Sequence, residues 1–190
     1  MHATRPSPLS KTLALVPPAV ALVAQHASGA FDAYIKIGDI KGEVQEKEHL
    51  EWVRLDSIEW NVKREITFIP GGASRESGRP QLSEVTISKQ VDKSSPQLFL
   101  NAVGGSGELD TVIIRLVESA TRSVFYELTL SQVLVSSQKQ GGKTDDDRPT
   151  ESVSFNFLKI EMKYSRIDPK TGESVPEPVV GFDLAKSQPL

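Results

Sequence analysis

The stretch GGKT at 141–144 is the closest this sequence comes to a nucleotide-binding motif. It resembles the end of a phosphate-binding loop, but that pattern also needs a glycine five residues before Gly142, where this chain has Ser137. The aspartates at 145–147 follow directly and would repel a phosphate. They also lack the alternating ligands, central glycine and distal glutamate of a calcium-binding loop, so we expect a solvated turn here.

Nucleophilic or acid–base catalysis would have to use His49, because the other histidines, His2 and His26, lie near the start of the chain. His49 belongs to EKEHLE, a charged stretch that we expect to be exposed, with no apolar pocket to raise the pKa of its glutamates. The chain has no cysteine, which excludes disulfides, thiolate catalysis and the common zinc sites. We therefore expect no catalytic residue, no metal and no cofactor, and hence no enzyme.

The first thirty residues differ from the rest of the chain. They contain no acidic residue, carry Arg5 and Lys11, run apolar from Leu13 to Ala24 and end on small residues at 28–30. This order is typical of a secretory signal, and the run is too short for a permanent membrane anchor. The pair Pro17-Pro18 would break a helix there, so a disordered extension and a misplaced start codon stay open as alternatives.

The remaining residues, 31–190, are expected to form a single domain. Removing the two cations of residues 1–30 changes the formal charge from −3 to −5. A mildly acidic body without a basic stripe argues against nucleic acid as a partner. A domain of this length can bury roughly 70% of its unfolded surface and needs no covalent staples.

Apolar and polar residues alternate with a period of two from Phe31 onward, which predicts a mainly β chain. The apolar set changes face at Asp56-Ser57 and again within 152–164, which favours a curved barrel over a flat sandwich. Long polar loops are expected between strands. The expected strands lie in 31–42, 51–69, 81–91, 110–117, 124–135, 152–164 and 178–184, and the expected loops at 70–80, 138–150 and 168–177.

One helix is expected at Ser95–Val103. Ser94 or Ser95 can cap it by accepting from free N–H groups, and Pro96 suits the first helical position. An apolar stripe is expected from two i,i+4 pairs, and a left-handed exit from the glycines that follow. These residues are Leu98 with Ala102, Phe99 with Val103, and Gly104 and Gly105. Such a helix would pack against the barrel and is not expected to be an active-site helix.

Six blocks of the sequence, in order, resemble the haemolysin-coregulated protein (Hcp) family, the tube proteins of the bacterial type VI secretion system. No block is specific alone, but together they cover residues 31 to about 187. They are DAYIKIGDIKGE at 32–43, EKEHLEW at 46–52, GRPQLSEVTISKQVDKSSPQLF at 78–99, YELTLSQVLVSS at 126–137, PTESVSFNFLKIEMKY at 149–164 and PVVGFDLAK at 178–186.

The resemblance implies a compact β-barrel of two sheets with one short α-helix, assembled as a homohexameric ring. Family rings stack into a tube that a contractile sheath drives out of the cell beneath a VgrG-type spike. The ring lumen holds small effector proteins and acts as their carrier. No catalytic residue belongs to this role, and stable membrane insertion is not part of it.

The resemblance also suggests which residues act in each role. Alternation in SIEWNVK places Ile58, Trp60 and Val62 inside the barrel, and the polar set between them would face the lumen. The lumen residues are then Glu59, Asn61 and Lys63. Ring stacking would use loops that contain Gly72, Arg75, Arg79, Ser119, Arg122 and Lys186, and the helix would lie near the subunit boundary with Ser95, Pro96 and Phe99.

The signal-like segment departs from the family, whose members are assembled in the cytoplasm without a cleaved leader. Three hypotheses follow. The first is a tube subunit, cytoplasmic before assembly and then secreted through the type VI system. The second is an exported Hcp-like module, periplasmic or extracellular, that uses residues 1–30 as its signal. The third is a small hydrolase that uses His49.

Overall fold

The computed structural model describes residues 31–68, 75–105, 107–168, 170–171 and 173–190. The expected signal-like segment and the boundary at residue 30 therefore stay predictions. In chain order, the elements of the described residues are β1 (Phe31–Ile37), the 3-10 helix η1 (Lys47–His49), β2 (Val53–Leu55), β3 (Ser57–Glu59), β4 (Val62–Lys63), β5 (Ile66–Phe68), β6 (Arg75–Ser77), β7 (Gln81–Leu82), β8 (Val85–Gln90), α1 (Ser95–Ala102), β9 (Leu109–Glu118), β10 (Val124–Gly141), β11 (Thr150–Ile167), β12 (Ser174–Pro176), β13 (Val180–Asp183) and β14 (Gln188–Pro189).

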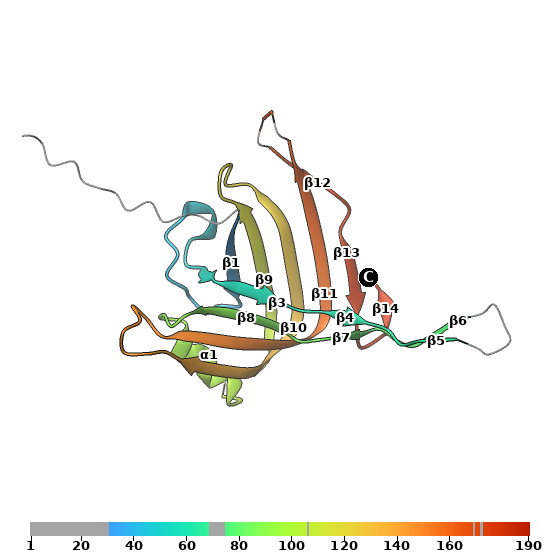
Figure 1. Ribbon diagram of the computed structural model, residues 1–190, viewed down its shortest axis with the longest axis horizontal. Helices are drawn as coiled ribbons and strands as arrows, with labels where there is room; N and C mark the ends of the chain where they lie inside the picture. The colour runs from blue at the N-terminus through green and yellow to red at the C-terminus, as the bar shows by residue number, and fades with distance from the viewer. Residues whose placement is uncertain (1–30, 69–74, 106, 169, 172) are drawn as a thin grey trace, which may run out of the picture.

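A single antiparallel sheet curls until it almost closes on itself (Figure 1). Its main path runs β14-β13-β11-β10-β9-β1-β2, while β8 pairs with β11 and β3 pairs with β8. Because β2 and β3 are consecutive in the chain, they connect the β2 end of this path to the branch formed by β8 and β3. The structure confirms a mainly β, barrel-like fold with one short α-helix, and its two layers are parts of one coiled sheet.

The apolar side chains that face inward along each strand form the core. In β1, for example, Ile35 and Ile37 are fully buried, while Lys36 between them is exposed. Period-two alternation places these side chains on one face, and the curl of the sheet brings the faces together. The other fully or nearly fully buried apolar residues include Val53, Val85, Ile87, Leu98, Val112, Ile114, Leu128, Leu130, Val133, Val153, Phe155 and Ile160.

Both expected changes of face are confirmed. The chain leaves β2 after Leu55 and changes partner, since β2 pairs with β1 and β3 pairs with β8. In β11 the buried set shifts between Phe157 and Ile160. Opposite this shift, Gln132 of β10 has a φ of 55° and drops out of the ladder. These irregularities let single strands serve both layers of the barrel.

The expected loop at 138–150 is shorter in the structure, at 142–149, because β10 extends to Gly141 and β11 begins at Thr150. β10 and β11 are 18 residues each and stay paired from Tyr126↔Tyr164 to Gly141↔Thr150. Polarity misled the prediction, because ladder hydrogen bonds can hold an exposed polar strand end without apolar side chains. Short strands also lie inside the other two expected loops, namely β6 in 70–80 and β12 in 168–177.

Helix α1 lies against the strands at one end of the barrel (Figure 1) and confirms the expected helix. Its capping differs from the expectation, because in the described part of the chain the Ser94 hydroxyl makes no capping hydrogen bond and the Ser95 hydroxyl donates to Glu151. Instead Asp92 accepts from both the backbone N–H and the hydroxyl of Ser94, and Ser95 Oγ accepts from the Asp92 N–H. The expected left-handed exit is present at Gly104, whose φ is 81°.

Candidate functional site

The three residues expected to face the lumen are exposed at the end of β3 and the start of β4. Glu59, Asn61 and Lys63 all point away from the core, while Ile58 and Trp60 between them pack against it. Alternation is therefore correct from Ile58 to Asn61. Which space the exposed set faces in an assembly stays a prediction.

Val62 was expected inside the barrel and is 56% exposed, so that expectation is wrong. By this point the chain has left the body and formed an arm, which we define as strands β4 to β7. Figure 1 shows this arm projecting from the barrel. Two separate two-stranded ladders, β4 with β7 and β5 with β6, hold it together, so no second layer covers Val62.

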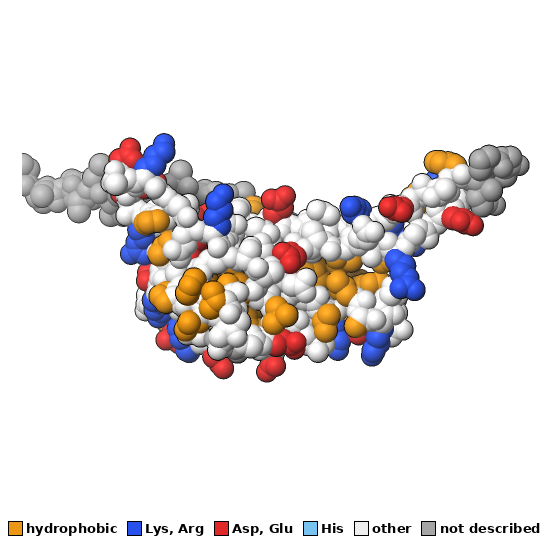
Figure 2. Space-filling model, turned by 90° about the horizontal axis from the view of Figure 1, so that it is seen from below, with side chains coloured by type: hydrophobic (Ala, Val, Ile, Leu, Met, Phe, Trp, Pro, Cys, Tyr) orange, Lys and Arg blue, Asp and Glu red, His pale blue; other side chains and the backbone are white. Residues whose placement is uncertain are grey.

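The outer part of the arm exposes large apolar side chains. Ile66 is 52% exposed and Phe68 is 72% exposed. Arg64 stabilises the hairpin formed by β5 and β6. Its guanidinium donates to the Gly78 carbonyl at 3.0 Å and to Ser77 Oγ at 2.8 Å. Where the arm meets the body, a hollow of about 310 Å³ is lined mainly by apolar residues, including Trp60, Leu82, Met162, Val180 and Phe182. Figure 2 shows hydrophobic side chains in this region.

Most of the residues expected in ring stacking lie at exposed positions. Arg75 is in β6 and Arg79 is in the arm after it, whereas Gly72 lies outside the described residues. Lys186 belongs to the turn after β13, where its backbone N–H donates to Asp183 Oδ1 at 2.8 Å. Their contacts with another subunit stay predictions.

The turn between β9 and β10 holds Ser119 and Arg122, and Arg122 is already engaged within the chain. Its guanidinium contacts Asp32 at 2.5 Å and Glu46 at 2.6 Å, and donates to the Tyr34 hydroxyl at 2.9 Å. The hydrogen bond from Arg122 holds the pKa of the Glu46 carboxyl below its usual range. Arg122 thus ties this turn to β1 and to the segment before η1.

His49 was expected to be exposed, and this is wrong: its side chain is 1% exposed. The imidazole stacks on Tyr34 at 4.6 Å between ring centroids and makes a T-shaped contact with Trp52 at 5.0 Å. Burial lowers the pKa of His49, although nearby Glu46 opposes this. Neither ring nitrogen has a hydrogen-bond partner among the described residues, so the geometry provides no hydroxyl for a His-activated nucleophile.

A buried ion pair, which the sequence did not lead us to expect, fixes α1 to the sheet. Lys89 and Glu151 are both fully buried, and their Nζ and Oε1 atoms are 2.7 Å apart. Lys89 also contacts Asp92 at 2.8 Å, and Ser95 of α1 donates to Glu151 at 2.7 Å. Ser95, which was expected near the subunit boundary, therefore hydrogen-bonds to the sheet of its own chain and is not free for a partner.

Two glutamines complete the surroundings of the Glu151 carboxylate. Gln138 and Gln140 each donate from Nε2 to Oε2, at 2.7 Å and 2.9 Å. Burial alone would raise the pKa of Glu151, but hydrogen bonds, above all from Lys89, hold it below its usual value. A signal was present in the sequence, because Lys89 follows Val85 and Ile87 in phase and so occupies an inward position.

The outer face of α1 is apolar and uncovered. The expected stripe divides in two: Leu98 is fully buried, whereas Phe99 and Val103 are 56% and 62% exposed. Leu100 is 46% exposed beside them. A hollow of about 550 Å³ adjoins this face, with Pro96 among its lining residues. Figure 2, which views the molecule from the side of α1, shows hydrophobic side chains over the helix.

The described residues contain no group of three or more His, Cys, Asp or Glu side chains arranged to hold a metal ion. In that same part of the chain, no helix is long and apolar enough to cross a membrane. The features that remain are surfaces: the α1 face, the arm and the polar end of β3.

Comparison with known proteins gives a consistent result. The family described as "Type VI secretion system effector, Hcp" matches residues 34–164. Protein hcp1 of Pseudomonas aeruginosa is 32% identical over 137 residues, which cover 71% of this chain and 83% of that protein. The solved "Structure of a type six secretion system protein" superposes with a TM-score of 0.79 at 25% identity, covering 85% of this chain and 100% of that one. Hcp1 of Salmonella typhimurium has the same fold, with a TM-score of 0.69 at 20% identity over 85% of this chain and 100% of its own. With the match extending from β1 into β11, the chain belongs to the Hcp family of type VI secretion system proteins.

Proposed function

We propose that this protein is a tube subunit of a type VI secretion system, forming stackable homohexameric rings whose lumen carries small effector proteins. Family membership is the observation that carries the proposal. The uncovered apolar surfaces of the single chain support it, because a subunit whose partners are absent exposes the side chains that they would cover. In this role its further partners are a VgrG-type spike and a contractile sheath.

Lateral contacts within the ring would use the outer face of α1. Phe99 and Val103 present apolar surface next to a hollow, and aromatic side chains that bury in such a site dominate interface energies. The buried Lys89–Glu151 pair holds the helix in place, so the face is preformed. Pro96 lies in the same hollow and would be covered together with Phe99.

Phe99→Asp tests this contact. It would place a charge in the interface while leaving the core intact, because Phe99 is more than half exposed. Light scattering should then give a monomer where the unchanged protein gives a hexamer. Leu50→Asp is the matched control, since Leu50 is also 56% exposed but follows η1 and is not part of the α1 face, and it should keep the hexamer. If the Phe99→Asp variant is still a hexamer, α1 does not form the contact between subunits.

Stacking of rings would use the arm, where the large apolar side chains of Ile66 and Phe68 are 52% and 72% exposed. Phe68→Asp should leave single rings intact and shorten the stacks seen by electron microscopy. Arg79 and Arg75 lie at the same arm and would set the charge of the contact. Long stacks formed by Phe68→Asp would contradict this role for the arm.

The lumen would be lined by Glu59, Asn61 and Lys63, which form a hydrated wall that holds cargo and releases it. Glu59→Arg should alter the set of proteins that co-purifies with the ring, without changing ring mass. Glu173→Arg, a reversal at an exposed position beside β12, is the control. An unchanged cargo profile in Glu59→Arg would contradict this assignment.

The signal-like composition of residues 1–30 favours one alternative, an exported binding module with the same fold. The two functions differ in where the mature protein is found. Mass spectrometry of cytoplasmic and periplasmic fractions decides between them. A cytoplasmic hexamer without cleavage supports the tube subunit, whereas a periplasmic species cut after Ala30 supports the exported module.

A further inference from the structure

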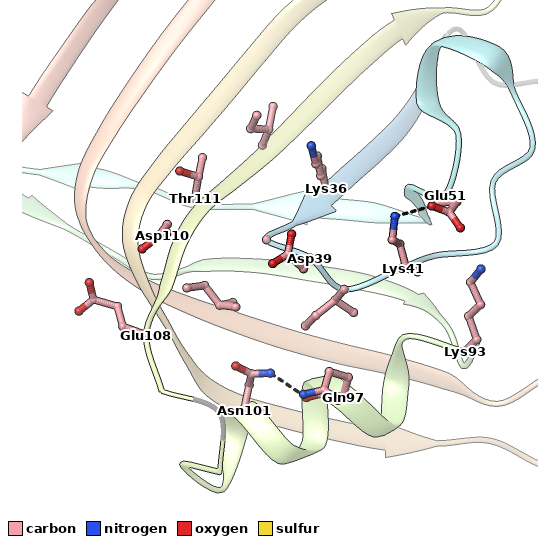
Figure 3. Close-up of a pocket in the computed structure, with 14 residues that line it drawn as sticks. Lys36, Asp39, Lys41, Glu51, Lys93, Gln97, Asn101, Glu108, Asp110 and Thr111 are labelled. Carbon is pink, nitrogen blue, oxygen red and sulfur yellow. Dashed lines mark hydrogen bonds and ion pairs between the residues drawn. The ribbon is translucent and has the colours of Figure 1, made fainter.

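A cleft of about 800 Å³ opens between β1, the start of β9 and α1. Figure 3 shows its lining side chains coming from these three elements and from the turn after β1. That turn is sharp: Gly38 has a φ of 48°, and its N–H donates to the Thr111 carbonyl at 3.0 Å. The volume lies in the range of sites that hold a small ligand or a short peptide segment. Family membership and the proposed ring assign no role to it.

Carboxylates and ammonium groups both line this cleft. Glu108 and Asp110 form an acidic end at the start of β9, and Lys93 lies at the other end, near the start of α1 (Figure 3). Between these ends the lining also carries Lys36, Asp39, Lys41 and Glu51. Within the described part of the chain, no hydrogen bond or ion pair engages Glu108 or Asp110. Near the Lys93 end, Lys41 pairs with Glu51 at 2.5 Å, and Glu51 also feels the charge of Lys93, whose ammonium makes no ion pair within 4 Å among the described residues.

The floor of the acidic end carries an unsatisfied acceptor. Asn101 is 6% exposed, and its Nδ2 donates to the Gln97 carbonyl at 2.8 Å. This bond fixes the orientation of the amide, so Oδ1 must be the atom directed elsewhere, and it has no partner among the described residues. A buried acceptor left unpaired costs free energy, so a bound donor that reaches it recovers that cost.

We propose that this cleft binds a zwitterionic ligand: an ammonium group at the acidic end, against Asn101 Oδ1, and a carboxylate at the Lys93 end. Either a free diamino acid or a polypeptide segment that carries a lysine close to an acidic residue supplies this chemistry. The lining offers little continuous apolar surface, so affinity depends on charge and hydrogen bonding and is expected to be in the millimolar range, about −4 kcal/mol.

Ligand-observed NMR titrations of the full chain test the proposal. The probes are L-lysine, cadaverine, which lacks the carboxylate, and the peptide Gly-Lys-Gly-Glu-Gly capped at both ends. Saturable binding of L-lysine or the peptide, at least fivefold tighter than cadaverine, is the expected result. Whichever of L-lysine and the peptide binds more tightly shows whether the ligand is a free amino acid or a polypeptide segment. Failure of both to saturate at 20 mM, or equal binding of cadaverine, would overturn the proposal.

Variants locate the binding. The double variant Glu108→Gln/Asp110→Asn changes two exposed side chains, so it should fold, and it should weaken all three probes about tenfold. Lys93→Gln should weaken L-lysine and the peptide but not cadaverine. Asn101→Leu removes the buried acceptor and should weaken every probe, with its fold checked by circular dichroism. Glu173→Gln, far from the cleft in sequence and exposed, is the charge-matched control. Undiminished binding to the double variant would overturn the assigned site.

Discussion

Replacing Lys89 with methionine is expected to destabilise the protein strongly. Lys89→Met keeps much of the side-chain volume but leaves the carboxylate of Glu151 buried without its cation, which lies 2.7 Å away in the unchanged protein. Breaking a buried pair by removing one partner costs about 3–5 kcal/mol, because the remaining charge stays desolvated. Hydrogen bonds to Glu151 from the two glutamines and Ser95 remain and place the expected loss toward the lower end of that range.

Urea unfolding at one fixed protein concentration measures this loss, since assembly would make the stability depend on concentration. A loss of about 3 kcal/mol corresponds to roughly 10 °C in Tm for a domain of this size. Lys139→Met, at an exposed position of β10, is the control and should change the free energy of unfolding by less than about 0.5 kcal/mol.

The double variant Lys89→Met/Glu151→Gln separates charge from packing. Glutamine keeps the shape of Glu151 and removes the unpaired charge, so the double variant should regain at least half of the free energy lost by Lys89→Met. If the double variant is no more stable than Lys89→Met, desolvation of the Glu151 charge is not the cause of the loss, and the reasoning is refuted.

Further predictions concern the turn network, the buried imidazole and one glycine. Arg122→Ala should lower the free energy of unfolding by about 1–2 kcal/mol and speed amide exchange in the turn after β9. Arg122→Lys should recover little of this loss, because only the guanidinium reaches Asp32, Glu46 and Tyr34 together. Amide protection in Arg122→Ala equal to that of the unchanged protein would contradict this. Burial lowers the pKa of His49 in the folded state, so below the usual histidine pKa of about 6.5 the unfolded state binds the proton more readily, and stability should fall as pH falls from about 7 toward about 5.5. The variant His49→Phe should flatten that dependence in urea titrations, and an unchanged slope would rule out His49 as its source. Gly42→Ala should unfold the turn before η1, because a Cβ there would overlap the Trp52 carbonyl group, whereas Gly141→Ala, with open space around it, should be tolerated in a thermal melt.

Local patterns in the sequence were sufficient for most of the long strands, the helix and the bends. Alternation over Phe31–Ile37 and the change of face at Asp56 needed only neighbouring residues, because side chains of a strand alternate whatever the strand later pairs with. Pro96 and Gly104 marked the ends of α1 for the same reason, since their backbone preferences are local. The family also followed from the sequence, as ordered blocks that the comparisons confirm.

Other features depended on contacts between distant segments. His49 looked exposed among charged neighbours, yet Tyr34 of β1 and Trp52 cover it. Glu151 and Lys89 lie far apart in the chain and meet only because β8 and β11 pair in register at that point. Val62 alternated like a core residue but has no layer above it, because the arm leaves the barrel.

Residue patterns along the chain were enough to predict most element types, the barrel-like class and the family, since these follow from local preferences and from blocks of residues kept in order. Tertiary structure alone decided which side chains are covered, which charges are paired and where the cleft lies beside α1. Burial and pairing are set by the register and curl of the sheet, and these depend on the summed contacts of all strands.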